Sequence, residues 1–361
     1  MSPKKIAVVR ANALGDFIFV LPALQALRDT YPDAEIVYLG KAWHQTFLEN
    51  RPSPISRVAV VPPYGGVGEA ENFENDENIL KPFFTEMQAE QFDIAIQMHG
   101  GGFYSNPFTK RLGAKVSVGL KTPNAIQLDI NVPYIIATSE ILRYIEVVRY
   151  LGASTADPEP SVKVINKDLQ EAKNAFRHNA GERYAVIHPG ASDMRRRWPA
   201  ENFAAIANYL VDQGYHVYIT GSEYERADIE RLFTHITYPD QIHNLCADLS
   251  LNGMTGLLAM ADVLVSNDTG PLHLARALKK PTIGIYWTIN AVTGMALTTS
   301  RNRSLIAWDP YCPLCGTDCV QPNYPKDNCK HEASFTAKVS IDEVKNALQD
   351  LLLTEAVDTA A

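Results

Sequence analysis

The sequence lacks an excess of basic residues. It contains 33 Lys and Arg against 41 Asp and Glu, which gives a formal net charge of -8. Proteins that bind nucleic acid normally carry a basic excess or a basic stripe. The densest basic clusters, Lys4-Lys5 and Arg195-Arg196-Arg197, are both short. We therefore expect no nucleic-acid partner.

Long apolar runs are also missing. The most apolar early run, FIFVLPALQAL from Phe17, is too short to cross a bilayer and contains Pro22. Arg10 and Asp16 interrupt the region that would have to be apolar in a signal peptide. We expect a cytoplasmic protein. The acidic net charge does not prevent peripheral contact with the cytoplasmic face of the inner membrane, because a local basic patch would suffice for it.

Several well-known motifs are absent as well. The chain has neither the G-x-G-x-x-G fingerprint nor the Walker pattern, which argues against a nucleotide-dependent oxidoreductase. The stretch HGGG at 99–102 resembles the oxyanion-hole motif of esterases, but that chemistry needs a G-x-S-x-G elbow, which the chain lacks. The sequence therefore excludes a serine hydrolase of that type.

Two series of alternating strand and helix patterns are present instead. The first predicts strands near 6–9, 35–39, 57–61, 93–97 and 115–118, with helices near 17–29, 78–89 and 140–151. A linker with Pro158 and Pro160 follows. The second predicts strands near 184–188, 216–220 and 263–265, with helices near 200–212, 223–232 and 340–353.

This alternation predicts an α/β fold with two doubly wound parallel sheets. We place the first, Rossmann-like domain at 1–160 and the second at 161–338, with a final helix in 339–361. Ligands of such sheets bind at the carboxyl ends of the strands. With two sheets in tandem, we expect the crevice between the domains to hold the ligand.

The loop RANALGDF, residues 10–17, follows the first strand and begins a helix. Its acid, Asp16, has two interpretations. It caps the helix, or it faces the crevice as a general base. The loop alone favours the cap.

Two loops of the second domain offer contacts for a nucleotide. HPGASDMRRRWP, at 188–199, places Ser192 and three arginines between a strand end and a helix start, which suits an anion at least as well as a solvated surface. TGSEYER, at 220–226, offers Glu223 and Glu225. An acid in such a position binds ribose hydroxyls or simply favours the helix dipole.

The stretch VSNDTGPLHLARALKKPTIGIYW, at 265–287, predicts an anion site at a helix start. Pro271 suits the first turn of a helix, and Gly270 lets the backbone approach a ligand closely. The amides of Thr269 and Gly270 lie at the positive end of the helix dipole, and His273 lies one turn inside. Asp268 either orients the turn or accepts a hydrogen bond from a sugar hydroxyl. A diphosphate is the expected ligand.

These loops resemble the heptosyltransferases of glycosyltransferase family 9, which build the inner core of bacterial lipopolysaccharide. NALGDFIFVLPALQALRDTYPDAEIVYL resembles the family's opening signature. HPGASDMRRRWPAENFAAIANYL and SNDTGPLHLARALKKPTIGIYW resemble its two donor-site signatures, in the same order. The resemblance implies a GT-B fold, in which two Rossmann-like domains face each other across a cleft and the final helix returns to the first.

The resemblance also implies roles for individual residues. Asp16 falls at the general-base position. The implied donor-binding residues are Ser192, Arg196, Glu225, Leu249, Asp268, Thr269, Gly270 and His273. Among them, Arg196 stands where the family places a lysine against the donor phosphates, Glu225 matches the ribose-binding acid, and Leu249 falls near the adenine.

The implied activity is an inverting, metal-independent transfer of heptose from ADP-heptose to a lipopolysaccharide inner-core or related glycan acceptor. One alternative keeps the fold but uses a hexose or N-acetylhexosamine donor, or a protein acceptor. Another is a non-catalytic subunit that binds a nucleotide sugar. Basic residues of the family's first domain meet phosphorylated acceptors, and Lys110, Arg111 and Lys121 are the candidates for that contact. No cofactor is expected for catalysis.

Four of the five cysteines form a cluster, CPLCGTDCVQPNYPKDNC, with C-x2-C-x3-C-x9-C spacing. Four thiolates suit a tetrahedral structural site for zinc or iron, formed by Cys312, Cys315, Cys319 and Cys329, with His331 as a substitute ligand. The alternatives are free thiols or disulfides formed on oxidation. Proteins that resemble the family hold iron through a similar cluster.

Overall fold

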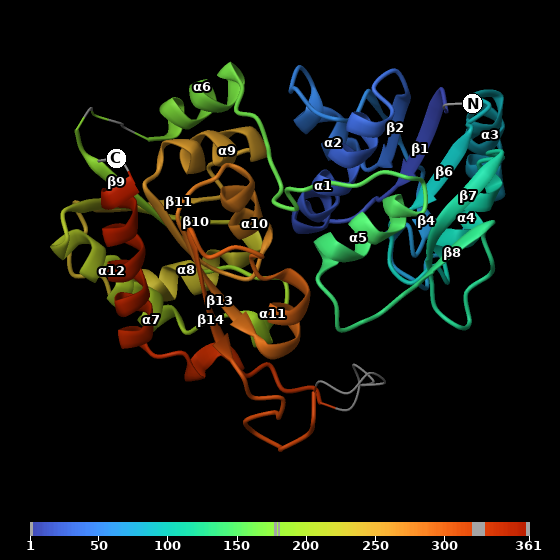
Figure 1. Cartoon of the computed structure of the whole chain (residues 1–361). Helices are drawn as coiled ribbons and strands as arrows, with labels where there is room; N and C mark the ends of the chain where they lie inside the picture. The colour runs from blue at the N-terminus through green and yellow to red at the C-terminus, as the bar shows by residue number, and fades with distance from the viewer. Residues whose placement is uncertain (1–2, 177–178, 180, 320–328, 359–361) are drawn as a thin grey trace. The chain divides into compact units, whose positions relative to one another are not determined.

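The structure is a computed structural model that describes residues 3–176, 179, 181–319 and 329–358. The chain forms two compact units, Met1–Lys163 and Val164–Ala361. The division lies three residues beyond the boundary of 160 expected from the sequence. Each unit is an α/β domain with one six-stranded sheet (Figure 1).

The first sheet has the strand order β3-β2-β1-β6-β7-β8, and all its pairs are parallel. Its strands are β1 (Lys5–Val9), β2 (Glu35–Gly40), β3 (Arg57–Val60), β6 (Ile94–Gln97), β7 (Val116–Lys121) and β8 (Ile130–Pro133). A two-stranded sheet, β4 (Tyr64–Gly65) with β5 (Gly68–Glu69), lies in the connection from β3 to α3. The central strands are buried on both faces, as the continuous apolar runs predict.

Helices cover both faces of this sheet. One face packs α3 (Glu77–Ala89) and α4 (Ser105–Arg111) through Phe84, Met87 and Phe108. The other packs α1 (Leu14–Thr30), α2 (Ala42–Leu48) and α5 (Glu140–Arg149). Helix α1 begins three residues before the expected start at 17, because the Asp16 carboxylate accepts a hydrogen bond from the Ala13 amide at 3.2 Å.

The second sheet repeats the design with the order β11-β10-β9-β12-β13-β14. Its strands are β9 (Arg183–His188), β10 (Tyr215–Gly221), β11 (Ile242–Cys246), β12 (Val263–Asn267), β13 (Thr282–Trp287) and β14 (Asn302–Ala307). Helices α7 (Ala200–Asp212), α8 (Arg226–Phe233) and α12 (Ile341–Asp358) cover one face. On the other side lie α6 (Asn166–Ala175), α9 (Leu251–Met260) and α10 (Gly270–Ala277), and α11 (Thr288–Gly294) follows β13.

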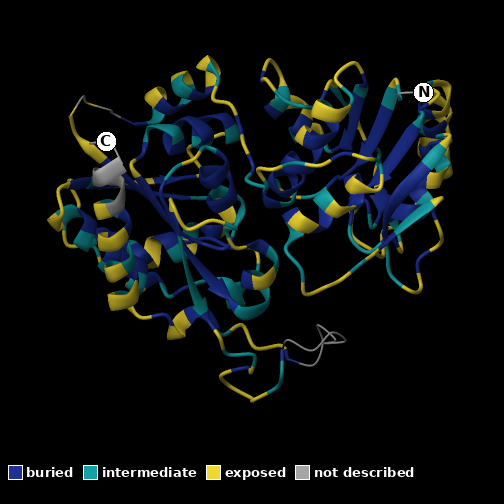
Figure 2. Cartoon of the chain, in the orientation of Figure 1, coloured by how far each residue is buried: buried dark blue, intermediate teal, exposed yellow. Residues whose placement is uncertain are grey.

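The final helix packs against the second unit, and its return to the first domain, which the resemblance implies, stays a prediction. Helix α12 contacts α7, β13 and β14, beside which it is drawn in red in Figure 1. Val344, Leu348 and Leu351 are buried in the second core. Because these residues are spaced by four and three positions, they share one face of the helix, and the second sheet takes up that face. Figure 2 shows the opposite side of α12 as largely exposed.

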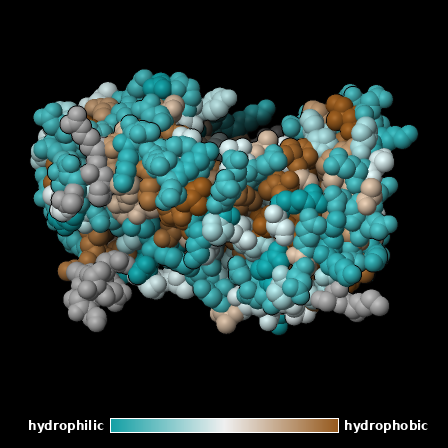
Figure 3. All heavy atoms as spheres, turned by 90° about the horizontal axis from the view of Figure 1, so that it is seen from above, coloured by the Kyte–Doolittle hydropathy of each residue, from teal (hydrophilic) through white to brown (hydrophobic). Residues whose placement is uncertain are grey.

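Hydrophilic residues cover most of the face that Figure 3 shows, in both units. Among the described residues, no helix combines the length and the apolar character needed to cross a membrane.

The burial of α12 leads to a stability prediction. Leu348 is fully buried, whereas Leu353 on the same helix is 70% exposed. Leu348→Ala should lower the free energy of unfolding by about 2–5 kcal/mol, because it leaves a cavity in the second core. Leu353→Ala is the matched control and should change it by less than about 0.5 kcal/mol. Urea unfolding followed by tryptophan fluorescence measures both, and equal effects would contradict this packing.

Candidate functional site

In both sheets the order in which successive strands are added reverses next to the first strand. In the first, β1 lies between β2 and β6, and in the second, β9 lies between β10 and β12. At such a switch point the loops after the two central strands diverge and leave a crevice at the carboxyl edge. The candidate residues of each unit gather at its own switch point.

Asp16 lies in the first turn of α1, directly after the loop that leaves β1. Its Oδ2 accepts the Ala13 amide at 3.2 Å, and its Oδ1 accepts a hydrogen bond from Arg10 at 2.6 Å. The side chain remains about one-third exposed. Asp16 therefore caps the helix and at the same time presents a carboxylate at the carboxyl edge of the first sheet, so the two interpretations are compatible.

A buried charge network supports Asp16 from behind. Arg10 is 2% exposed; it donates to the Met98 carbonyl at 2.8 Å and lies 3.4 Å from a Glu140 oxygen. Glu140 also accepts hydrogen bonds from Arg143 and Tyr144. Burial alone would lower the pKa of Arg10, but the neighbouring Tyr144, Asp16 and Glu140 raise it. Arg10 thus stays charged and fixes the orientation of Asp16.

In the second unit, Asp268 lies in the loop that the sequence predicts to bind an anion. It directly follows β12 in the connection to α10, and its side chain is 6% exposed. Oδ2 lies 3.1 Å from the Arg196 guanidinium, and Oδ1 lies 3.1 Å from Nε2 of His273. Burial alone would raise the pKa of Asp268, but the hydrogen bond from His273 and the charge of Arg196 outweigh it and lower the pKa. Asp268 therefore orients the two donors that flank the loop.

The structure separates the three consecutive arginines. Arg196 reaches Asp268 and also donates to the Ser192 hydroxyl at 2.8 Å. Arg195 forms a bidentate pair with Asp193, and Arg197 pairs with Asp228. Only Arg196 of the three lies beside the start of α10, because the short helix η1 (Met194–Arg196) turns successive side chains in different directions.

Two further side chains hold this loop and were not expected from the sequence. Nη1 of Arg276 lies 3.2 Å from Nδ1 of His273, which therefore accepts, so Nε2 carries the proton that faces Asp268. The fully buried Asn267 accepts from the Trp198 amide at 3.0 Å and donates to the Pro189 carbonyl at 2.6 Å. The i, i+3 spacing of His273 and Arg276 is a weak signal for the first pair, and nothing in the sequence marks the second.

Glu225 differs from Glu223 in its surroundings. Glu223 forms an exposed pair with Arg226. Glu225 is 9% exposed, and its Oε2 accepts both the amide and the hydroxyl of Ser222, at 2.7 and 2.8 Å. A Cβ added at Gly190 would lie 1.9 Å from Oε1, so a larger residue there would displace the Glu225 carboxylate. This contact brings the loops after β9 and β10 together around the Glu225 carboxylate.

Leu249 lies in the loop between β11 and α9, next to the N-cap Ser250. It is half-buried, and its Cδ2 lies 3.2 Å from the place of a Cβ at Gly253. The loops after β9, β10, β11 and β12 thus all open at the same edge of the second sheet.

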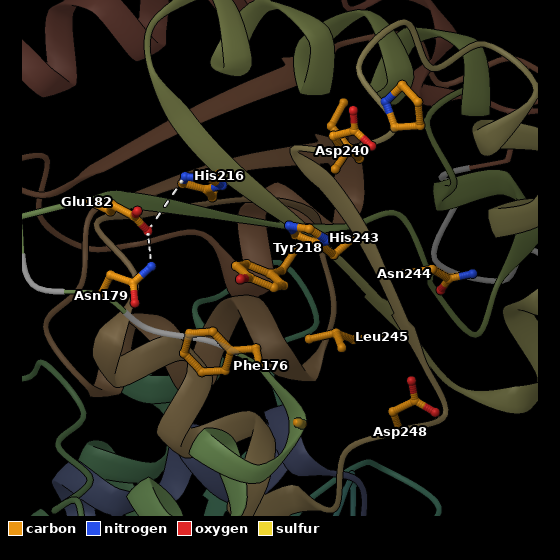
Figure 4. A pocket seen from close by; sticks show the side chains of 13 residues that line it. Phe176, Asn179, Glu182, His216, Tyr218, Asp240, His243, Asn244, Leu245 and Asp248 are labelled. Atoms are coloured by element: carbon orange, nitrogen blue, oxygen red, sulfur yellow. Dashed lines mark hydrogen bonds and ion pairs between the residues drawn. The ribbon is translucent and has the colours of Figure 1, made fainter.

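A cavity of the second unit lies away from these residues. It measures about 800 Å³ and is lined by residues of β10 and β11 and by Asp248, just beyond β11 (Figure 4). The rings of His216 and Tyr218 lie 6.4 and 5.0 Å from that of His243, and Glu182 lies 3.6 Å from His216. No predicted donor-binding residue lines it. The residues predicted to bind the donor lie instead in the loops that follow β9, β10, β11 and β12.

The cysteine cluster forms with one change. The ligand atoms of Cys312, Cys315, Cys329 and His331 all lie within 4.8 Å of one another. Cys319 lies outside this group, because its sulfur lies 3.3 Å from the Thr317 carbonyl and packs with Trp287 and Phe335. His331 thus replaces Cys319 in the group of four that the spacing predicts. The sulfurs of Cys315 and Cys329 lie 3.7 Å apart, so both cysteines are free thiols in this structure.

A family model described as glycosyltransferase family 9 (heptosyltransferase) matches residues 81–307. This match covers more than half of the chain, including every donor-site loop of the second unit. The chain belongs to glycosyltransferase family 9. It is accordingly a glycosyltransferase, and Asp16 lies in the part that precedes the match.

Relatives and solved structures agree with this membership. The chain is 21% identical to the lipopolysaccharide core heptosyltransferase OpsX of Haemophilus influenzae, over 79% of each chain. It is 25% identical to lipopolysaccharide heptosyltransferase 1 of Escherichia coli K12, over 78% of this chain and 87% of that one.

The fold matches three family structures in particular. A family 9 glycosyltransferase from Veillonella parvula has a TM-score of 0.78 at 18% identity, with 97% of both chains covered. The ADP-heptose lipopolysaccharide heptosyltransferase II of E. coli gives 0.73 at 19%, covering 98% and 99%. The iron-containing, dodecameric heptosyltransferase TibC from enterotoxigenic E. coli gives 0.55 at 12%, covering 98% and 77%. The family's GT-B fold is therefore confirmed.

The charge centre at Asp268 leads to a prediction. Asp268→Asn removes the buried partner of Arg196 and His273 and should lower stability at pH 7 by about 1–3 kcal/mol. Because the fold lowers the pKa of Asp268 below 3.8, this stabilisation is present above about pH 4 and is lost as the pH falls through the folded value. Urea unfolding at several pH values should therefore show the two proteins converging in acid.

Asp350→Asn is the control for this experiment. Asp350 pairs with Arg303 at the surface of the same unit and has a side chain 65% exposed. Its removal should change stability by less than about 1 kcal/mol. A loss of stability in Asp268→Asn that stays constant down to pH 3 would refute the role of its charge.

Proposed function

We propose that the protein transfers a heptose from ADP-heptose to an acceptor of the lipopolysaccharide inner core or a related glycan. The observation that carries this proposal is the convergence of Arg196, Asp268 and His273 on the start of α10. The proposal is also supported by membership of the family and by the functions of the relatives named above. ADP-heptose and the lipopolysaccharide acceptor come from those relatives.

In the proposed donor site, the diphosphate lies against the free amides of Thr269 and Gly270. These amides lie at the positive end of the α10 helix dipole, which stabilises negative charge. Arg196 adds a cationic donor beside Asp268, and the Nε2 proton of His273 holds the Asp268 carboxylate in place. Glu225 accepts from the ribose hydroxyls, and Leu249 packs against the adenine.

The proposed reaction is a single displacement with inversion. Asp16 removes the proton of an acceptor hydroxyl, the oxygen forms a bond to the anomeric carbon, and the bond from that carbon to the diphosphate breaks. ADP leaves with the bonding electrons, and its new charge is stabilised by the α10 amides and Arg196. Arg10 and the Ala13 amide hold Asp16 in place.

Asp16→Asn tests this assignment, because it keeps the cap acceptor but removes the base. Transfer should fall by about 100- to 10,000-fold, while calorimetric ADP binding stays unchanged. Asp29→Asn is the matched control: Asp29 lies near the exposed end of the same helix and bonds only Gln25 there. Undiminished transfer by Asp16→Asn would remove the base assignment, and ADP binding without any transfer by the wild type would favour a non-catalytic subunit.

We further propose that Cys312, Cys315, Cys329 and His331 hold one structural metal ion. Ligands about 2.1–2.3 Å from a tetrahedral zinc ion lie about 3.6–3.8 Å apart. The separations of 3.7 Å between Cys315 and Cys329 and 3.6 Å from His331 Nδ1 to the sulfurs of Cys312 and Cys329 fit this geometry. Iron is favoured over zinc only by the iron-containing TibC. With four protein ligands the site is closed, so it stabilises the segment and takes no part in the transfer.

Elemental analysis of the purified protein tests the metal site. The wild type should contain about one ion per chain, and Cys315→Ser and His331→Ala should lose most of it. Cys319→Ser should retain it, since its sulfur lies outside the group of four. Loss of metal in Cys319→Ser with retention in His331→Ala would restore the four-thiolate site.

A further inference from the structure

The first unit contains a pocket of about 530 Å³ at its own switch point. We propose that this pocket binds the acceptor, and that the acceptor group entering it is an uncharged, hydroxyl-rich sugar without phosphate or carboxylate. This inference rests on the proposed function. The volume of the pocket is within the range of roughly 300–1,000 Å³ that small-molecule sites have.

The pocket adjoins the proposed base. It is lined by Asn12, in the loop from β1 to α1, and by His99 to Ser105, in the loop from β6 to α4. His99 ties these loops together, because its Nδ1 accepts the Ala11 amide at 3.2 Å. Asn12 is four residues before Asp16, so a sugar in the pocket lies beside the loop that presents the carboxylate.

Glycines keep this pocket open. A Cβ at Gly101 would lie 2.5 Å from Thr122 and 3.4 Å from the Tyr134 ring, and one at Gly66 would lie 2.3 Å from the Tyr104 ring. The HGGG stretch therefore shapes a binding pocket, a role that its likeness to an esterase motif does not predict.

Among the residues that the structure describes, none that lines this pocket is a cation. Glu71 is its one charged side chain, and it is acidic. Burial, followed by the charge of Arg10, lowers the pKa of His99 to about 3, so His99 is neutral at physiological pH. A phosphate or carboxylate in this pocket would be desolvated beside Glu71 without a positive partner, which is unfavourable.

The basic residues expected to meet a phosphorylated acceptor are paired elsewhere. Lys110 lies 3.4 Å from Asp129, and Arg111 forms a bidentate pair with Glu77. Lys121 donates to the carbonyls of Thr122 and Pro123.

Two more cations near the wall, Arg10 and Arg143, are both paired with Glu140. One basic side chain, Lys41, comes near the β1 loop: its Cε lies 3.8 Å from the place of a Cβ at Gly68. Lys41 is not part of the lining.

The lining does offer what a neutral sugar needs. The side chain of Asn12 and the Nδ2 group of Asn124 form no hydrogen bond within the described part of the chain, so both are available to hydroxyl groups. Phe103, Tyr104 and Tyr134 supply aromatic rings that pack against the apolar faces of a sugar ring. Small-molecule sites usually combine a few polar groups with apolar and aromatic walls, as this pocket does.

The test measures binding of two matched probes to the full-length protein by saturation-transfer NMR, with and without ADP. The probes are a methyl heptoside and the same glycoside carrying one phosphate monoester. We expect the neutral glycoside to bind more tightly by roughly tenfold or more. Asn12→Ala and Asn124→Ala should each weaken it severalfold, and Glu71→Lys should narrow or reverse the preference.

Lys41→Ala separates this proposal from an anionic acceptor. This substitution should change the dissociation constant of each probe by less than about twofold relative to the wild type. Tighter binding of the phosphorylated probe, lost in Lys41→Ala, would overturn the proposal, as would binding of neither probe. ADP binding is recorded separately by calorimetry, so loss of the proposed donor function is distinguished from an error about the acceptor pocket.

Discussion

The parallel arrangement of both sheets is the constraint on which the rest of the structure depends. In a parallel sheet every carboxyl end lies on the same edge, and a reversal of strand order opens a crevice there. The loops after β1 and β6 meet at this point in the first unit, and those after β9 and β12 meet in the second. Residues far apart in the chain, such as Ser192, Glu225 and Asp268, are therefore neighbours before any ligand binds.

In each unit, a charge pair fixes the loop that carries the candidate residues. Arg10 holds Asp16 in the first unit, and Asp268 holds Arg196 and His273 in the second. A buried charge without its partner is costly, so each member requires the other. This requirement keeps donors and acceptors in place in advance, which is how a site stabilises charge that develops during a reaction without rearranging.

Much of this organisation follows from local sequence signals. The apolar runs locate β1, β2, β9 and β10 within a residue or two, because strands buried on both faces need such runs. The turn Ser266–Pro271 and the single acid Asp16 mark where a helix begins after a strand. Short elements such as α2, α6 and β11 were not predicted, because they lack a complete apolar repeat.

The sequence by itself determined the fold class, the two-unit organisation and the strand-to-helix loops that hold the candidate residues, since periodicity and turn chemistry are local. Only the tertiary structure decided that Arg196, of three adjacent arginines, reaches Asp268, that His331 replaces Cys319, that α12 packs on the second unit, and that the HGGG stretch lines a pocket without cations. These outcomes depend on side-chain directions and on contacts between segments distant in sequence, which spacing along the chain does not encode.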